Sequence, residues 1–215
     1  MDPGTPYTAV VLAGGKAARL GGQAKPQLEV GGRTMLATVL AAVPDSAERI
    51  VVGPSQPVPD GVRLVREKPP GGGPVAALRA ALTLVSTDVV ALLAADLPFL
   101  TAGLIAELRA RLTADGVLVV DDGGRDQYLL GVWWTAALRS ATVDVRGPTP
   151  LRRVIASLSV TRYRPEAEPG TPPAWTDCDT PADLARARAA VARPRAPVPP
   201  AASTSLIPRF LSPPD

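Results

Sequence analysis

Short apolar runs alternate with amphipathic stretches along the first 192 residues of the chain. Apolar runs bounded by turn residues predict strands, and stretches with helical periodicity predict helices. The expected strands are residues 8–13, 49–53, 62–66, 88–94, 117–121, 128–133 and 159–163. The expected helices are residues 34–43, 75–85, 102–112, 134–141, 150–156 and 181–192. The alternation of the two classes indicates an α/β protein built from βαβ units around a mainly parallel sheet.

Two features refine this picture. A short turn around Gly123 and Gly124 separates two expected strands, which predicts an antiparallel hairpin and therefore a mixed sheet. The last expected helix has a good start signal. Thr180 can cap it, Pro181 fits its first position, and Asp183 favours its first turn.

The composition changes at residue 193. Residues 193–215 contain seven prolines and no periodic apolar pattern. Such a segment predicts a Pro-rich disordered tail. We therefore expect one domain over residues 1–192 and a tail over residues 193–215.

The overall composition limits where the protein is expected to reside and which classes of partner it is expected to bind. No apolar run reaches the roughly 18–20 residues of a membrane span, and the N-terminus lacks the pattern of a signal peptide, so we expect a cytoplasmic protein without membrane contact. Cys178 is the only cysteine and cannot form an internal disulfide. The net charge is +3, but the basic residues are scattered and aromatics make up 4%. This composition does not favour nucleic-acid binding.

The absence of two residue types limits the chemistry. The chain has no histidine, which excludes Ser-His-Asp triads and histidine metal sites. It also has no asparagine, so a metal would be bound by carboxylates, carbonyls or water, which favours Mg²⁺ over zinc. Only three of the 23 basic residues are lysines, and two of them, Lys16 and Lys25, lie in one loop.

That loop follows the first expected strand and spans residues 12–32, LAGGKAARLGGQAKPQLEVGG. Glycines after a strand let the backbone approach a phosphate closely, and Arg19 and Lys25 bring two cations to it. The loop matches neither a P-loop nor a dinucleotide fingerprint. Without further information, it could also be a flexible glycine turn with incidental charges.

The loop resembles the signature of the GT-A-like nucleotidyltransferase superfamily, and the chain is most similar to the MobA-like molybdenum cofactor guanylyltransferases over residues 7–192. The resemblance implies a three-layer α/β/α Rossmann-like fold with a mostly parallel mixed sheet. It also implies that the nucleotide is wrapped by four residues, Leu12, Ala13, Gly14 and Gly15. Arg19 and Lys25 are then expected to contact the phosphate chain.

Residues 71–77, GGGPVAA, resemble the family segment that faces the base, with Gly73 inside it. Ala77 stands where the family usually has glycine. Glu67 occupies the place of an aspartate that reaches the nucleoside in relatives. The alternative for this stretch is a plain helix-entry loop.

Asp96 follows an expected buried strand. The carboxyl ends of parallel strands are where open α/β sheets bind ligands. In the family this aspartate holds Mg²⁺ on the α-phosphate. It could instead cap the next helix, but Thr101 already suits that role.

Two further segments are candidates for the acceptor. Residues 124–127 resemble a hairpin that contacts the acceptor in relatives, which nominates Arg125 and Asp126, although charged glycine turns are also common on surfaces. Asp177 and Asp179 belong to an element preceding the last helix that resembles the family's D-x-D-T-P motif. If that element is extended, both carboxylates point the same way, towards the metal or the acceptor.

The resemblance implies transfer of GMP from GTP to molybdopterin with release of pyrophosphate, with Mg²⁺ as cofactor. Arg19, Lys25 and Asp96 are the expected catalytic residues, and Asp96 is the expected metal ligand. A relative that uses CTP or a sugar- or erythritol-phosphate acceptor is the alternative within the enzyme class. A catalytically silent nucleotide-binding module is the alternative outside it.

Overall fold

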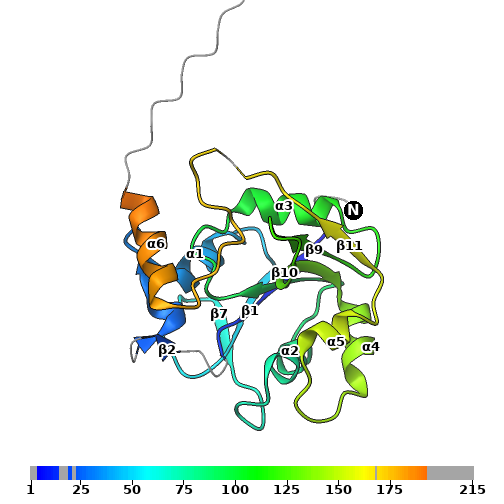
Figure 1. The fold of residues 1–215 in the computed structure, drawn as a ribbon. Coiled ribbons are helices and arrows are strands. Elements are labelled where there is room, and N and C mark those ends of the chain that lie inside the picture. The colour runs from blue at the N-terminus through cyan, green and yellow to red at the C-terminus, as the bar shows by residue number, and fades with distance from the viewer. Residues whose placement is uncertain (1–3, 15–18, 21–22, 168, 193–215) are drawn as a thin grey trace, which may run out of the picture.

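The computed structural model describes residues 4–14, 19–20, 23–167 and 169–192. A seven-stranded sheet forms its centre, in the order β11-β9-β10-β8-β1-β6-β7 (Figure 1). Its strands are β1 Tyr7–Leu12, β6 Glu48–Val52, β7 Val62–Val65, β8 Val89–Ala94, β9 Gly116–Val120, β10 Asp126–Trp134 and β11 Val160–Tyr163. All seven strands expected from the sequence are present, with ends shifted by at most two residues.

The sheet is mixed, as predicted. β1 pairs in parallel with β6 and β8, and β7 pairs in parallel with β6. β10 runs antiparallel to both β8 and β9, so the hairpin expected around Gly123 and Gly124 is confirmed. β11 closes that edge in parallel with β9.

Helices cover both faces of the sheet, because β1 is apolar on both sides. Tyr7, Ala9 and Val11 belong to one buried cluster, whereas Val10 and Leu12 belong to the other. Helices α1 (Met35–Ala41) and α3 (Ala102–Ala110) pack into the first cluster. Helices α2 (Pro74–Leu82), α4 (Thr135–Val143) and α5 (Leu151–Ile155) pack into the second (Figure 1). The three-layer α/β/α fold is therefore confirmed.

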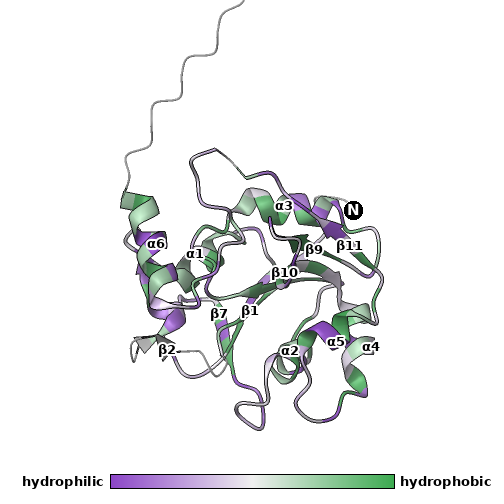
Figure 2. Cartoon of the chain, in the orientation of Figure 1, coloured by the Kyte–Doolittle hydropathy of each residue, from purple (hydrophilic) through white to green (hydrophobic). Residues whose placement is uncertain are grey.

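Helix α6 (Pro181–Ala192) lies outside these layers and completes a third, smaller cluster with the hairpin of β4 (Glu29–Val30) and β5 (Arg33–Thr34). Its expected start is confirmed. The Thr180 hydroxyl accepts a hydrogen bond from the Asp183 backbone N–H at 3.2 Å, and the Asp183 carboxylate accepts one from the Thr180 N–H at 2.7 Å. Helices α3, α5 and α6 each carry hydrophobic and hydrophilic segments, as helices packed on one side do (Figure 2).

Five short elements were not expected from the sequence. They are β4, β5, β2 (Arg19–Leu20), β3 (Gln23–Ala24) and the 3₁₀ helix η1 (Lys25–Gln27). Within the described ranges, no helix is long and apolar enough to cross a membrane. The predicted tail, residues 193–215, lies outside the described residues.

Candidate active site

The candidate site lies where parallel strands end. The Ala13 N–H donates to the Val52 carbonyl at 2.8 Å, and the Ala95 N–H donates to the Leu12 carbonyl at 3.2 Å. These bonds tie the exits of β1, β6 and β8 together. Asp96, two residues beyond β8, therefore emerges beside the glycine loop that follows β1.

Lys25 joins this edge to the segment before α6. Its Nζ lies 2.5 Å from an oxygen of Asp96 and 2.6 Å from an oxygen of Asp179. The Lys25 side chain is only 6% exposed, whereas that of Asp179 is 65% exposed. Burial would lower the pKa of Lys25, but the hydrogen bonds to Asp179 and Asp96 outweigh it and raise the pKa. The ammonium is therefore firmly charged.

A third carboxylate, Asp177, adds to this cluster. Partial desolvation, followed by the charges of Asp179 and Asp96, raises the pKa of Asp177. Between the two aspartates, Cys178 is fully buried in the small cluster under α6, and burial raises the pKa of its thiol to about 11. Residues 177–179 therefore alternate as an extended segment, with the thiol inside and both carboxylates outside.

A cavity of about 660 Å³ opens on the β1 side of the cluster. Leu12, Gly14, Glu67, Gly73 and Ala77 all line it. The buried Glu67 carboxylate accepts a hydrogen bond from the Gly71 N–H at 2.9 Å, and so holds the glycine segment in place. Four of the expected nucleotide-binding residues thus share one cavity, whereas Ala13 is buried in the hydrophobic cluster of α1 and α3.

This cavity also has walls that the motifs did not indicate. They are Pro54, Arg66, Leu129 and Pro148. Pro148 comes from the connection between α4 and α5, far from the glycine loop in sequence. Only the fold brings it to this position, and nothing in its local sequence signals a ligand.

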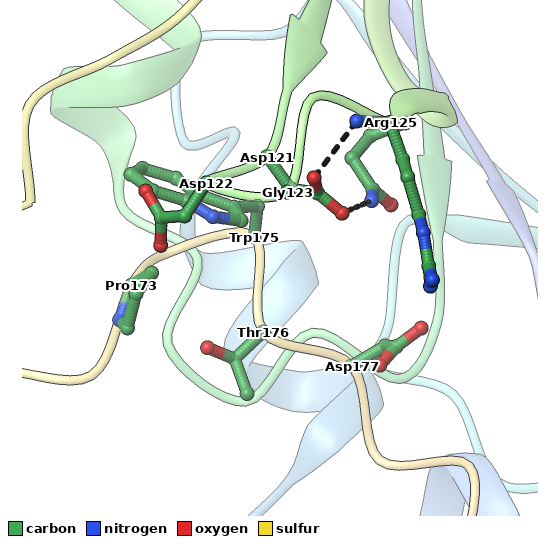
Figure 3. Close-up of a pocket in the computed structure, with 9 residues that line it drawn as sticks. Asp121, Asp122, Gly123, Arg125, Pro173, Trp175, Thr176 and Asp177 are labelled. Carbon is green, nitrogen blue, oxygen red and sulfur yellow. Dashed lines mark hydrogen bonds between the residues drawn. The ribbon is translucent and has the colours of Figure 1, made fainter.

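A second cavity, of about 330 Å³, opens beside Asp177 (Figure 3). Asp121, Arg125, Trp175 and Asp177 are among its lining residues, and the Arg125 side chain extends along one of its sides (Figure 3). The Asp121 carboxylate accepts hydrogen bonds from the Arg125 N–H and the Gln127 side chain, both at 2.9 Å. These bonds lower the pKa of Asp121, the one from Arg125 having the largest effect. Asp121 therefore fixes the turn that carries Arg125.

The remaining expected site residues lie elsewhere. The Asp126 carboxylate takes a two-pronged ion pair from Arg162 of β11, with two contacts of 2.9 Å, and is not among the residues that line the second cavity. The Arg19 backbone belongs to β2, but its side chain lies outside what the structure describes, as does Gly15. Trp175 was missed by the sequence analysis, because one tryptophan in a Pro-rich loop matches no motif.

The donor set suits Mg²⁺. Asp96 and Asp179 each place an oxygen within 2.6 Å of one cationic nitrogen, so a cation already stands between them. Among the described residues, no three acidic or thiol side chains are grouped closely enough to hold a metal. Mg²⁺ is usually bound by one or two carboxylates together with substrate phosphates, and this arrangement fits that pattern.

Comparison with known proteins identifies relatives of the chain. The chain is 33% identical over 141 residues to the molybdenum cofactor guanylyltransferase of Bradyrhizobium sp. strain ORS 278. That match covers 60% of this chain and 66% of the relative, so the chain spans about two thirds of that relative's length.

Solved structures show the same fold at lower identity. The 2-C-methyl-D-erythritol 4-phosphate cytidylyltransferase of Thermus thermophilus has a TM-score of 0.65 at 21% identity, over 87% of this chain and 99% of that one. The molybdopterin-guanine dinucleotide biosynthesis protein A of Archaeoglobus fulgidus has a TM-score of 0.61 at 18% identity, over 85% and 97%. The family model described as MobA-like NTP transferase domain matches residues 9–163. The chain therefore belongs to the family of MobA-like NTP transferase domains.

Proposed function

We propose that this chain transfers GMP from GTP to a phosphate of molybdopterin, with Mg²⁺ as cofactor and pyrophosphate as the second product. The observation that carries the proposal is the cluster of Lys25, Asp96 and Asp179 at the carboxyl end of the parallel strands. Leu12 and Gly14, at the end of β1, line the larger cavity, and Asp177, whose pKa responds to the charges of Asp179 and Asp96, lines the smaller one. A transferase needs a donor site and an acceptor site that share one set of charged groups. The name of the Bradyrhizobium relative supports this choice of substrates.

The cavity of about 660 Å³ is the proposed donor site. Leu12 and Gly14 would contact the nucleotide at the end of β1, while Gly73 allows close approach of the base at the start of α2. Gly73 adopts a φ of 86°, and a side chain there would be strained. Glu67 would reach the nucleoside while one of its carboxylate oxygens still accepts the hydrogen bond from the Gly71 N–H.

Asp96 and Asp179 are the residues that would hold Mg²⁺, and the ion would supply charge stabilisation at the α-phosphate. Lys25 and Arg19 would orient the phosphate chain and balance its charge as pyrophosphate departs. A phosphate oxygen of the acceptor attacks the α-phosphorus, the bond from that phosphorus to its bridging oxygen breaks, and pyrophosphate leaves with the electron pair. The nucleophile is already an anion, so the chain needs no histidine as a base.

The cavity of about 330 Å³ is the proposed acceptor site. Arg125 carries the positive charge that an acceptor phosphate needs, and Asp121 fixes the turn that presents it. Asp177 lines this cavity and also belongs to the carboxylate cluster. It would therefore lie closest to the point where donor and acceptor meet.

Pyrophosphate release tests the proposal. The protein is incubated with Mg²⁺, molybdopterin and one of GTP, CTP, UTP or ATP, and Asp96→Asn serves as the inactive control. Release with GTP only, and only when molybdopterin is present, is the expected result. Preference for CTP would assign a cytidylyltransferase instead. Nucleotide binding without pyrophosphate from any mixture would show a silent binding module.

A further inference from the structure

The Lys25 ammonium occupies the place between Asp96 and Asp179 that a bound cation would take. Both carboxylates reach the same nitrogen, at 2.5 and 2.6 Å, and the Lys25 side chain is almost fully buried. Contacts this short are charge-assisted hydrogen bonds, the stronger class. A metal ion that arrives alone must therefore compete with a cation that is tethered to the protein.

The charges in the cluster show that the Lys25 ammonium does not neutralise the carboxylates around it. One ammonium faces Asp96 and Asp179 directly, and Asp177 stands close enough for their charges to raise its pKa. Counted over the described residues, the cluster is thus negative when its acids are ionised. No third acidic or thiol ligand completes a metal site among the residues the structure describes, so phosphates and water must supply the remaining ligands.

We propose that Lys25 is a placeholder for the metal, and that the divalent cation enters together with the nucleotide, in exchange for the Lys25 ammonium. The inference rests on the proposed function. The triphosphate brings a new anionic partner for Lys25 and further oxygen ligands for the metal. Lys25 would then move from the carboxylates to the phosphates, and Asp96 and Asp179 would hold the metal. Lys25 acts as a positioning residue for the metal ligands before it acts on the substrate.

The proposal has an unusual consequence for a lysine variant. If Lys25 served the phosphates alone, its loss would leave metal binding to the nucleotide-free protein unchanged. If Lys25 is a placeholder, replacing it with methionine uncovers two carboxylates and tightens metal binding. Lys68 is the matched control. Its replacement by methionine removes the same charge, and the described ion pairs of Asp96 and Asp179 are with Lys25, not with Lys68.

The first measurement is Mn²⁺ binding without nucleotide, from the electron paramagnetic resonance signal of free Mn²⁺. We expect Lys25→Met and the more polar Lys25→Gln to bind Mn²⁺ at least about tenfold more tightly than the wild type, since about 1.4 kcal/mol corresponds to a factor of ten. Lys68→Met should match the wild type. Equal or weaker binding in folded Lys25 variants would overturn the proposal.

The second measurement needs no variant and uses the scarcity of lysine. In protein labelled with ¹⁵N-lysine, only three ammonium groups can give signals, and the buried one should exchange its protons most slowly. We expect Mg²⁺ alone to leave this signal in place and Mg²⁺ with GTP to shift it. A shift with Mg²⁺ alone would contradict the placeholder role. Neither measurement involves turnover, so failure of the proposed reaction would appear separately, as absence of pyrophosphate.

Discussion

Two buried cations, Arg109 and Lys25, lie at opposite ends of the sheet. They differ in how far the carboxylates around them balance their positive charge. At the amino end of β1, the Arg109 guanidinium contacts Asp45 at 2.5 Å, donates to the Thr5 carbonyl at 3.0 Å and lies 4.3 Å from the centre of the Tyr7 ring. At the carboxyl end, Lys25 faces two aspartates with a third nearby. In the part of the chain that the structure describes, Arg109 contacts the carboxylate of Asp45, whereas the acids around Lys25 outnumber it.

The matched site has the properties of a structural ion pair. The Tyr7 hydroxyl also donates to Asp45, at 2.6 Å. Burial alone would raise the pKa of Asp45, but the hydrogen bonds from Tyr7 and Arg109 outweigh it and lower the pKa. Burial and the bond to Asp45 in turn raise the pKa of Tyr7. Tyr7 and Asp45 are thus held in their folded protonation states, whereas the described acids around Lys25 favour a further cation.

The largest expected effect is on catalysis at the unmatched site. Asp96→Asn keeps the shape of the side chain and removes one metal ligand. We expect turnover to fall by several orders of magnitude, because metal charge stabilisation contributes several kcal/mol. Thermal melting should change little, since Lys25 keeps its contact with Asp179. Pyrophosphate release and melting are measured on the same preparation. A variant that melts far lower but turns over normally per folded molecule would make Asp96 a structural residue.

The matched site should respond in the opposite way. Asp45→Ala removes the carboxylate that contacts the buried Arg109 and accepts the hydrogen bond of the Tyr7 hydroxyl. Loss of one partner of a buried pair costs about 3–5 kcal/mol, but the Asp45 side chain is 58% exposed, so we expect about 2 kcal/mol. Urea unfolding measures this loss, while turnover per folded molecule should stay at the wild-type level. A large loss of turnover at full stability would remove the contrast between the two ends.

Cys178 tests how the carboxylates are positioned. Its side chain is fully buried with Leu28, Met35 and Leu184 under α6. Cys178→Ser places a hydroxyl in this apolar cluster and should cost about 1–2 kcal/mol of unfolding free energy. Cys178→Ala, which removes volume without adding polarity, is the matched comparison, and chemical denaturation of both variants separates the two effects. Equal stability of Cys178→Ser and the wild type would show that the thiol does not anchor the segment.

The smallest expected effect is a pH dependence at Asp177. Its pKa in the folded protein is raised above the ordinary value of 3.8, so the folded state holds this proton more tightly than the unfolded state. The stability that this provides is present below pH 3.8 and is lost as the pH rises through the raised pKa. Asp177→Asn cannot ionise, so it should melt higher than the wild type at neutral pH and equally below pH 3.8. Melting curves across this range measure the difference, and a constant offset at every pH would contradict it.

Hydrophobic periodicity was sufficient to predict the seven strands and the six main helices, because every one of these elements buries an apolar face. It did not predict β2, β3, β4, β5 or η1, which are two or three residues long and too short to show a period. The hairpin and the start of α6 were predictable from local turn and capping chemistry. These signals are carried by neighbouring residues, so they need no knowledge of the fold.

The site was only partly predictable. Motifs nominated Lys25, Asp96 and Asp179, but the direct contact of one ammonium with both carboxylates joins residues 154 positions apart in the chain, and no local pattern encodes it. Asp126 illustrates the same limit, because its partner Arg162 lies on a strand 36 residues further along. The charge excess at one end of the sheet and the match at the other appear only when the folded chain brings these residues together.

The most direct test is a crystal structure of the protein with Mn²⁺ and a GTP analogue that cannot be cleaved at the α-phosphate. Anomalous scattering locates the manganese, and the electron density locates Lys25. We predict a manganese peak between the carboxylates of Asp96 and Asp179 and in contact with the α-phosphate, with the Lys25 ammonium on the phosphate chain. A nucleotide bound in the cavity beside Gly73 with no manganese at Asp96, and with Lys25 still bridging both aspartates, would contradict the account.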